Sequence, residues 1–305
     1  TEPEKLEQYQ TDEETDPRKF HLPEAVVLPK DAQEIAAVIK LANTYDVPVT
    51  VRSGGTSLAG GAIPVCGGIV LLMERLNKII ELNAEGMYME VEAGVRTVDI
   101  QKYANEAGFL YAGDPCSAES CLIGGNIATN AGGNKAVRYG VTRDQVYAVE
   151  VVTPTGEIVE LGARLKKKST GYCLEQLIMG SEGTLGIITK ATLKLLPLCP
   201  YKLDLLAIFT DLDKAVGLVP NLIKAGLNPT SVEFMDNAFV RSSSDYCELK
   251  LPHYEDGFYV IVTVETFNED ELESKMEQLD EICSASGATD VLEADDRVWK
   301  LRRNC

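Results

Sequence analysis

Three glycine-rich stretches constrain this chain more than any other feature of its sequence. The first, RSGGTSLAGG at 52–61, directly follows an apolar run at 47–51. The second covers 113–140 and holds two more Gly-Gly pairs, and the third, MGSEGTLGIITK, covers 179–190. Glycine reaches positive φ and lets main chain approach a neighbour closely, so such stretches suit loops around a ligand better than a core. Three of them in one chain predict a ligand long enough to be touched in three places.

The first stretch has the chemistry of an anion site. Successive backbone N–H groups in a glycine loop form a concave nest for an anion, and Ser53, Thr56 and Ser57 add hydroxyl donors, which suits a diphosphate. The alternative is a tight surface turn, but two Gly-Gly pairs six residues apart favour the ligand. The pattern is neither G-x-G-x-x-G nor G-x-x-x-x-G-K-[ST], which disfavours NAD and ATP.

Charge and composition exclude several classes of function. The 305 residues include 29 basic and 47 acidic ones, a net charge of −18, which repels nucleic acid and anionic bilayers. No apolar run approaches the roughly 20 residues of a membrane helix, and the acidic N-terminus lacks the apolar core of a signal peptide. Eight scattered cysteines show no metal spacing, so we expect reduced thiols, no metal on them and a cytoplasmic protein.

Local patterns predict strands and helices that alternate around the glycine stretches. Asp31 with Glu34 three residues later predicts a helix N-terminus with a capping box, and Thr97 predicts another N-cap. Gly108 suits the left-handed position after that second helix. A turn at 154–156 predicts a β-hairpin. The expected strands lie at 25–29, 47–51, 67–73, 78–82, 87–95 and 185–198, the hairpin at 145–161, and helices at 31–46, 97–108 and 174–180.

The composition of the sequence changes near residue 200, and glycine is rarer beyond it. Beyond it the order is β-α-β followed by β-α, with helices expected at 213–225 and 270–286. We therefore expect a polar lead-in at 1–20, a first domain at 21–199 and a second domain at 200–305.

Four motifs in order carry a resemblance to a known family. RSGGTSLAGG, DP…IGGNIATNAGG…RYGVTRD, EVVTPTGEIVE and GSEGTLGIITKATLKLLP together resemble the FAD-binding domain of the vanillyl-alcohol-oxidase flavoprotein superfamily. Within it they are most similar to the FAD-linked D-2-hydroxyacid dehydrogenases, which include the glycolate oxidase large flavin subunit, D-lactate dehydrogenases and D-2-hydroxyglutarate dehydrogenases. The resemblance is dense over residues 20–200. It implies an α+β fold, with a two-subdomain FAD-binding domain followed by part of an α/β cap domain for the substrate.

The resemblance also implies which residues hold FAD. The pyrophosphate would bind to Ser53, Gly54, Gly55, Thr56, Ser57, Gly60 and Gly61. The flavin and its ribityl chain would lie along Asp114, Pro115, Ser117, Gly124, Gly125, Asn126, Ala128 and Thr129. The adenosine half would lie along Glu182, Gly183 and Ile188. Some relatives attach the flavin through a His or Cys of the first loop, and this loop has neither, so the FAD is expected to be non-covalent.

A second resemblance lies in RVWKLRR, residues 297–303. It is similar to a Trp-x-Leu-Arg pattern of the family, so Arg302 would pair with the substrate carboxylate, which a guanidinium fork suits. The alternative is a helix with surface arginines and a buried Trp299. The family continues beyond this pattern with metal-binding histidines and a general base, which neither His21 nor His253 matches. We therefore expect a C-terminally truncated chain that holds the flavin without that base or metal.

The resemblance implies an FAD-dependent enzyme that oxidises a small 2-hydroxy acid, such as glycolate or D-lactate, to the 2-oxo acid. The hydride would pass to flavin N5, and the redox chemistry would be the cofactor's own. Electrons would then pass to an electron-transfer flavoprotein, an iron–sulfur subunit, a quinone or oxygen. Since a fold does not fix function, two alternatives stay open: a flavin-dependent non-redox transferase resembling the ether-lipid synthases, and a flavin-binding electron-relay subunit.

Overall fold

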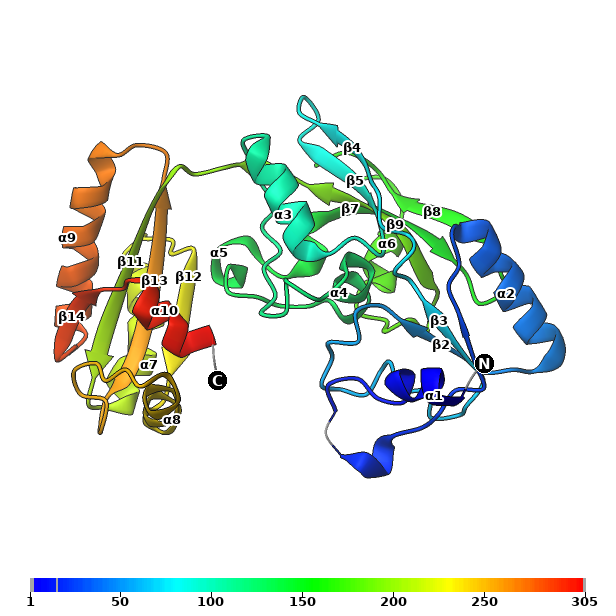
Figure 1. Cartoon of the computed structure of the whole chain (residues 1–305). Coiled ribbons are helices and arrows are strands. Elements are labelled where there is room, and N and C mark those ends of the chain that lie inside the picture. Colours follow the sequence, from blue (N-terminus) through cyan, green and yellow to red (C-terminus); the bar gives the residue numbers. More distant parts are fainter. Residues whose placement is uncertain (1–2, 15, 304–305) are drawn as a thin grey trace. The chain divides into compact units, whose positions relative to one another are not determined.

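A computed structural model describes residues 3–14 and 16–303, which form two compact units (Figure 1). Unit 1 comprises the described residues up to Gly132 together with Val141–Pro197. Unit 2 comprises Gly133–Gly140 together with the described residues from Leu198 onward. The chain therefore contributes a short segment to unit 2 and returns to unit 1 before it completes unit 2.

Unit 1 begins with a small parallel sheet in the order β1-β3-β2, built from Ala25–Val27, Ile69–Leu72 and Val49–Arg52. Helix α2 (Ala32–Tyr45) makes the crossover that parallel strands require. The predicted N-cap is confirmed, because the Asp31 carboxylate accepts from Glu34 N at 2.8 Å. The Glu34 carboxylate bonds to Lys30 N at 2.9 Å, so it reaches one residue before the position that a capping box uses.

A larger antiparallel sheet forms the other part of unit 1, in the order β4-β5-β9-β7-β8. The predicted hairpin is confirmed: β7 and β8 pair, Thr153 N donates to Glu157 O at 2.8 Å, and Gly156 has φ 79°. Two further strands, β6 and β10, pair with each other. The strands are β4 (Ile79–Asn83), β5 (Tyr88–Glu92), β6 (Phe109–Leu110), β7 (Val146–Val152), β8 (Ile158–Gly162), β9 (Ile187–Lys194) and β10 (Leu196–Pro197).

The helices of unit 1 correct two expectations. Thr97 is the first residue of α3 rather than its N-cap; the cap position is Arg96, and Thr97 is fully buried, where its hydroxyl accepts from Asn126 Nδ2 at 2.6 Å. Gly108 has the expected positive φ, 80°. Helix α4 arises inside the stretch expected to be loop. The helices are α1 (Pro3–Leu6), α3 (Thr97–Glu106), α4 (Ile123–Thr129) and α6 (Leu174–Ile178), with 3-10 turns at Glu7–Tyr9, Pro17–Lys19 and Thr142–Gln145.

Unit 2 is an antiparallel sheet in the order β12-β13-β11-β14 with helices on both faces (Figure 1). The central strand β13 is buried along nearly its whole length, which requires cover on both sides. One face packs against α7 and α9, and the other against α8 and α10. The elements are β11 (Tyr201–Phe209), α7 (Leu212–Lys224), β12 (Ser231–Met235), α8 (Asn237–Cys247), β13 (Phe258–Thr266), α9 (Asp270–Ala285), β14 (Asp290–Glu293) and α10 (Asp296–Arg303).

The early segment of unit 2 carries α5 (Ala136–Tyr139), which packs on β12. Arg138 donates to Thr230 Oγ1 at 3.1 Å, and the Tyr139 hydroxyl donates to Glu265 Oε2 at 3.2 Å. Burial, together with the Glu265 carboxylate, raises the pKa of Tyr139, which extends the pH range in which the hydroxyl is a donor. Polar side chains of α5 therefore fix it to the sheet that the later chain builds.

Replacing Asp31 with Ala should destabilise α2 by about 1 kcal/mol, because the cap supplies an acceptor that Glu34 N otherwise lacks. Hydrogen exchange followed by mass spectrometry should show faster exchange in peptides covering α2. Asp270→Ala, which removes no side-chain cap bond from α9, is the matched control and should leave the α2 peptides unchanged. Unaltered exchange in D31A would contradict the capping role.

Candidate cofactor-binding site

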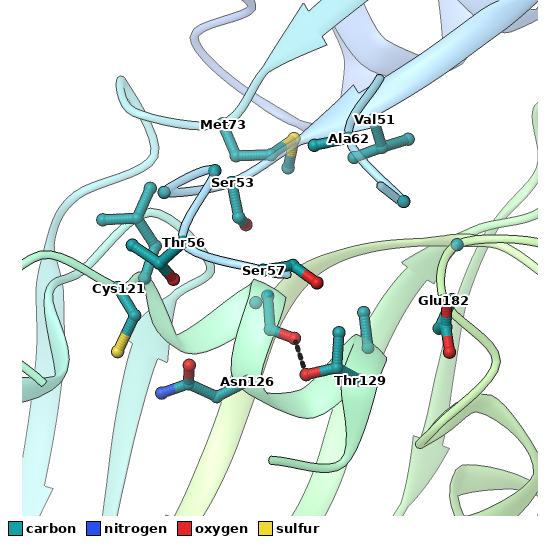
Figure 2. A pocket seen from close by; sticks show the side chains of 18 of the residues that line it. Val51, Ser53, Thr56, Ser57, Ala62, Met73, Cys121, Asn126, Thr129 and Glu182 are labelled. Carbon is teal, nitrogen blue, oxygen red and sulfur yellow. Dashed lines mark hydrogen bonds between the residues drawn. The ribbon is translucent and has the colours of Figure 1, made fainter. Parts of the chain in front are cut away.

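A cavity of about 220 Å³ lies in unit 1 where the three glycine-rich stretches meet (Figure 2). Strand ends supply its apolar walls, and the glycine-rich segments supply its hydroxyls and exposed backbone. The lining residues are Val51, Ser53, Gly54, Gly55, Thr56, Ser57, Gly61, Ala62, Met73, Ser117, Cys121, Leu122, Gly124, Gly125, Asn126, Ala128, Thr129, Ala131, Glu182, Gly183, Gly186, Ile187 and Ile188.

The structure brings together most of the residues that the sequence assigned to the cofactor. Gly60, Asp114 and Pro115 are the exceptions, since none of them lines the cavity. The Asp114 carboxylate accepts from Gln101 Nε2 at 3.1 Å, and Pro115 is buried. Lining residues that the sequence did not single out are Val51, Ala62, Met73, Cys121, Leu122, Ala131, Gly186 and Ile187. Most of these are apolar and sit beside strands, where a residue pattern alone indicates core.

Four consecutive backbone amides in the first stretch are available to a ligand. Within residues 3–14 and 16–303, the N–H groups of residues 54–57 donate to no acceptor, and all four residues line the cavity. Residues 54–57 are half-buried at the cavity, so a ligand that enters it can accept from these N–H groups without breaking a bond within the described residues. The second stretch differs, because Gly124 N donates to Ala93 O at 2.8 Å and Gly125 N to Leu122 O at 3.0 Å. Of these two stretches, residues 54–57 therefore have the geometry that suits an anion, and we call these four residues the nest.

Several glycines let the chain approach itself rather than a ligand. A Cβ added at Gly54 would lie 2.7 Å from Ser120 O, and one at Gly125 would lie 2.9 Å from Ser53 Cβ. The first and second stretches thus touch through positions that tolerate no side chain. Gly61 is different, because an added Cβ would meet nothing closer than Glu182 Oε2 at 3.6 Å. At Gly61 the missing side chain leaves room in the cavity itself.

The buried Thr97 hydroxyl organises the floor of the cavity. It accepts from Asn126 Nδ2 at 2.6 Å and contacts Cys121 Sγ at 3.4 Å. Asn126 is 5% exposed and lies in α4, where Thr129 Oγ1 donates to Gly125 O at 3.0 Å (Figure 2). Because Thr97 belongs to α3, one hydroxyl ties two helices together and fixes the side chains of Asn126 and Cys121 at the cavity wall.

Charge inside the cavity is sparse. Among the described residues that line it, Glu182 is the one with a charged side chain, and this exposed carboxylate lies near Gly61 at one side of the cavity (Figure 2). Its backbone has φ 52° and is held by a bond from Glu182 N to Ala128 O at 2.8 Å. A carboxylate accepts hydrogen bonds from hydroxyl and amino groups. The site therefore offers backbone N–H groups to an anion and a carboxylate to the polar groups of a nucleoside.

Comparison with known families matches two consecutive segments of the chain. Residues 23–162 match the family described as FAD binding domain, and residues 202–305 match FAD linked oxidases, C-terminal domain. The chain belongs to the FAD-linked oxidases. FAD is accordingly its cofactor, and the cavity fits it, because unpaired amides suit the diphosphate, Glu182 suits the sugar hydroxyls, and apolar walls at Met73 and Ile187 suit an aromatic ring.

Similar FAD-linked oxidases include two named relatives. The chain is 40% identical over 283 residues to a D-lactate dehydrogenase of Anaerostipes hadrus, which covers 91% of this chain and 59% of that protein. It is 37% identical over 275 residues to the glycolate oxidase subunit GlcD of Bacillus subtilis (strain 168), covering 90% and 58% respectively. The chain thus spans less than two thirds of the length of these relatives.

Among solved structures, p-cresol methylhydroxylase with substrate bound is similar at a TM-score of 0.83 and 18% identity. The match covers 99% of this chain and 65% of that one. At this identity the likeness concerns the fold, and it confirms the α+β flavoprotein fold expected of an FAD-linked oxidase.

Replacing Gly61 with Val should weaken FAD binding by about 10-fold or more, because the added side chain occupies cavity space while the backbone accepts it. Quenching of flavin fluorescence on titration of the apoprotein gives the Kd, and circular dichroism gives the melting temperature of the apoprotein. Gly217→Val, on α7 where an added Cβ meets nothing within 4 Å, is the control. A wild-type Kd in G61V would place the FAD elsewhere.

Proposed function

We propose that this chain is the FAD-carrying part of an enzyme that oxidises a small 2-hydroxy acid, such as glycolate or D-lactate, to the 2-oxo acid. The observation that carries the proposal is the run of unpaired amides at residues 54–57 in a cavity shared by all three glycine-rich stretches. Family membership and relatives named D-lactate dehydrogenase and glycolate oxidase subunit support it. When bound, FAD supplies the hydride acceptor, flavin N5.

The proposed roles of the lining residues follow from their chemistry. The amides of residues 54–57 hold the diphosphate, and the hydroxyls of Ser53, Thr56 and Ser57 supplement them. Asn126 and Thr129, fixed through α4, contact the flavin and ribityl part, while Glu182 accepts from the adenosine hydroxyls. We propose non-covalent attachment, since the first loop lacks His and Cys. Cys121 lines the cavity, and its thiol contacts the Thr97 hydroxyl.

Arg302 is the residue we propose for the substrate carboxylate. Its Nε and Nη2 both approach Glu233 Oε2, at 2.8 and 2.7 Å, so one edge of the guanidinium is held by a single carboxylate oxygen. The Arg302 side chain is 28% exposed and that of Glu233 is 12% exposed. In the part of the chain that is described, no other ion pair involves Arg302. A substrate carboxylate would bind at the Nη1 edge, with Glu233 fixing the direction of the fork.

We also propose that the electrons pass onward to a partner, either an electron-transfer flavoprotein, an iron–sulfur subunit or a quinone. The name of the Bacillus subtilis relative describes a subunit, which supports a multi-component system. None of the helices in the described residues combines the length and apolar character needed to cross a bilayer. The seven cysteines described are all free thiols, which supports our proposal of a cytoplasmic location.

The absorption spectrum tests the proposed reaction. The purified chain, reconstituted with FAD, should show oxidised flavin bands that bleach on anaerobic addition of D-lactate, glycolate or D-2-hydroxyglutarate. Acid precipitation should release all of the flavin into the supernatant. Flavin bands that persist with every acid would show that this chain alone, in which neither His21 nor His253 matches the family's general base, does not oxidise them, or would favour a non-redox transferase or a relay subunit. A yellow pellet would contradict non-covalent attachment.

Arg302→Lys should raise the substrate concentration that half-saturates flavin reduction by about 10-fold, because an ammonium group cannot replace the planar fork. The limiting rate of reduction should change less, since a carboxylate contact of this kind acts on substrate and transition state alike. Arg297→Lys on the same helix, where Arg297 is 69% exposed and paired with Asp295, is the control. Equal effects of the two substitutions would contradict the proposal that Arg302 binds the substrate carboxylate.

A further inference from the structure

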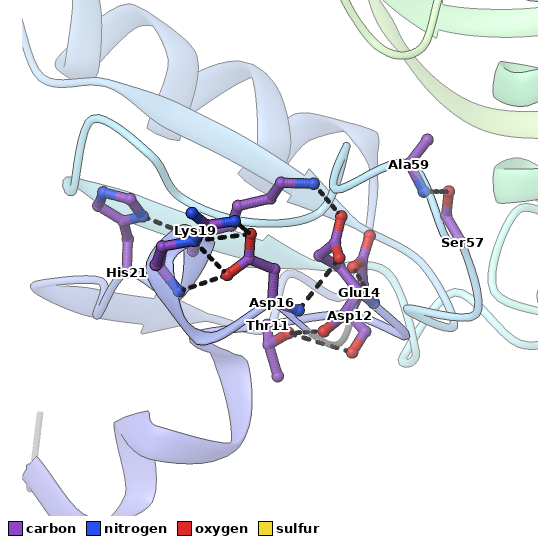
Figure 3. Close-up of polar contacts among 9 residues, drawn as sticks. Thr11, Asp12, Glu14, Asp16, Lys19, His21, Ser57 and Ala59 are labelled. Atoms are coloured by element: carbon purple, nitrogen blue, oxygen red, sulfur yellow. Dashed lines mark hydrogen bonds and ion pairs between the residues drawn. The ribbon is translucent and has the colours of Figure 1, made fainter.

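The N-terminal segment of unit 1 lies against the nest at 54–57, although its sequence shows only a polar, acidic stretch (Figure 3). We call residues 9–14 the strap. Glu13 N donates to Ser57 O at 3.1 Å, and Arg52 Nη1 donates to Thr11 O at 2.6 Å. One bond therefore joins the strap to Ser57, the last residue of the nest, and the other joins it to Arg52, which precedes the nest. We propose that the strap holds the nest in its anion-binding shape and that Arg52 is the positioning residue that couples the two.

The nest has little internal support of its own. Residues 53–57 belong to no helix or strand, and their amides from Gly54 to Ser57 bond to no described acceptor. The bond from Ala59 N to Ser57 Oγ, at 3.1 Å, is local to the turn that follows. A flexible loop that must present several N–H groups to one ligand loses conformational entropy when the ligand binds, which lowers affinity. Other contacts that order the loop beforehand reduce this cost. The strap supplies such contacts.

The Arg52 guanidinium fills the space beside the nest. A Cβ added at Gly55, which has φ 66°, would lie 2.3 Å from Arg52 Nη2, so Gly55 leaves the space that the guanidinium occupies. The same guanidinium lies 5.9 Å from the centre of the Tyr9 ring. Burial lowers the pKa of Arg52, while Asp12 and Tyr9 oppose that shift, so strap residues favour the charged form. Arg52 thus contacts the strap and the nest at the same time.

The strap is itself ordered by its own bonds. Thr11 Oγ1 donates to Glu14 O at 3.0 Å, and Glu14 N donates to Asp12 Oδ1 at 2.9 Å. Glu14 also pairs with Lys19, and His21 N donates to Gln10 O at 3.0 Å (Figure 3). These bonds hold the strap independently of the nest, so its bonds to Ser57 and Arg52 can constrain the loop.

The strap is acidic, so it cannot favour an anionic ligand by electrostatic attraction. Asp12, Glu13 and Glu14 carry negative charge beside a loop assigned to a diphosphate, so their charges oppose binding. The strap can favour FAD only by geometry, through Glu13 N–H and the Thr11 carbonyl. Removing a strap charge should therefore leave FAD affinity unchanged or raise it slightly, whereas removing a strap bond should lower it.

A matched pair at residue 13 tests the inference. Glu13→Pro removes the N–H that bonds to Ser57 O, and Glu13→Ala keeps that N–H and removes the exposed carboxylate. Titration of the apoprotein with FAD, followed by fluorescence quenching, should give a Kd about 10-fold higher for E13P and unchanged or lower for E13A. The apoprotein melting temperatures, measured in parallel, should agree between the two variants.

Arg52 provides the second test. Arg52→Met should raise the Kd for FAD by about 10- to 100-fold, and Arg52→Lys, which keeps a charged donor for the Thr11 carbonyl, should recover part of the loss. ADP, which carries the diphosphate without the flavin, should lose affinity in the same proportion. If R52M fails to fold, the residue 13 pair decides the matter.

Wild-type Kd values for FAD in both E13P and a folded R52M would overturn the inference, as would equal weakening in E13A and E13P. The inference rests on the assignment of residues 54–57 to the diphosphate, not on oxidation of a hydroxy acid. G61V tests that assignment separately, so a strap variant that binds FAD normally while G61V does not would refute the strap alone.

Discussion

Close contact between the first two glycine-rich stretches is the constraint on which the cofactor cavity depends. Gly54 lies against Ser120 O, and Gly125 lies against Ser53, at distances where a Cβ has no place. These contacts bring the first stretch against α4. The hydrogen bond from Asn126 to the Thr97 hydroxyl then fixes α4 against α3. The cavity is what remains between segments that pack this closely, so its walls are mostly backbone and small side chains.

The same arrangement explains how a chain of net charge −18 accommodates an anionic cofactor. Long-range charge is screened beyond roughly 10 Å in ordinary salt, while oriented N–H groups act at contact distance. The cavity contains no cationic side chain among its described lining residues, and its one carboxylate, Glu182, lies near Gly61 rather than belonging to the nest. If the diphosphate binds at residues 54–57, as proposed, its affinity depends on the shape of one loop, and the contacts that hold that shape matter as much as those that touch the ligand.

Much of the fold follows from local signals in the sequence. The hairpin at β7 and β8 is set by its turn residues, and the start of α2 by Asp31, because both signals act between residues close in the chain. The prediction of Thr97 as an N-cap was wrong because its partner is distant in sequence. Thr97 lies near the start of the helix, but it is buried and its hydroxyl bonds to Asn126, 29 residues later. Two glycines concealed α4, which tertiary contacts stabilise against its weak helix propensity.

The sequence pointed to the lining residues of the cavity where glycine and hydroxyl residues cluster, and the resemblance added the apolar Ala128 and Ile188, whereas most other apolar lining residues gave no signal. Met73 and Ile187 have the pattern of strand residues, and nothing local separates a wall of a cavity from a wall of a core. The strap was inaccessible for a related reason. Its bonds to Arg52 and Ser57 span more than 40 residues of sequence, and on the strap they use only backbone atoms, which carry no signature in the residue types.

The short helix α5 has a consequence for the order in which the molecule can assemble. During synthesis α5 is made well before its bonding partners in unit 2. The partner of Arg138, Thr230, follows 92 residues later, and the partner of Tyr139, Glu265, follows 126 residues later. Until those partners have been synthesised, Arg138 and Tyr139 cannot form these two hydrogen bonds. Unit 1 is likewise interrupted, because Val141–Pro197 follows the excursion. Neither unit is a continuous stretch of chain, so no single cut in the polypeptide separates one complete unit from the other.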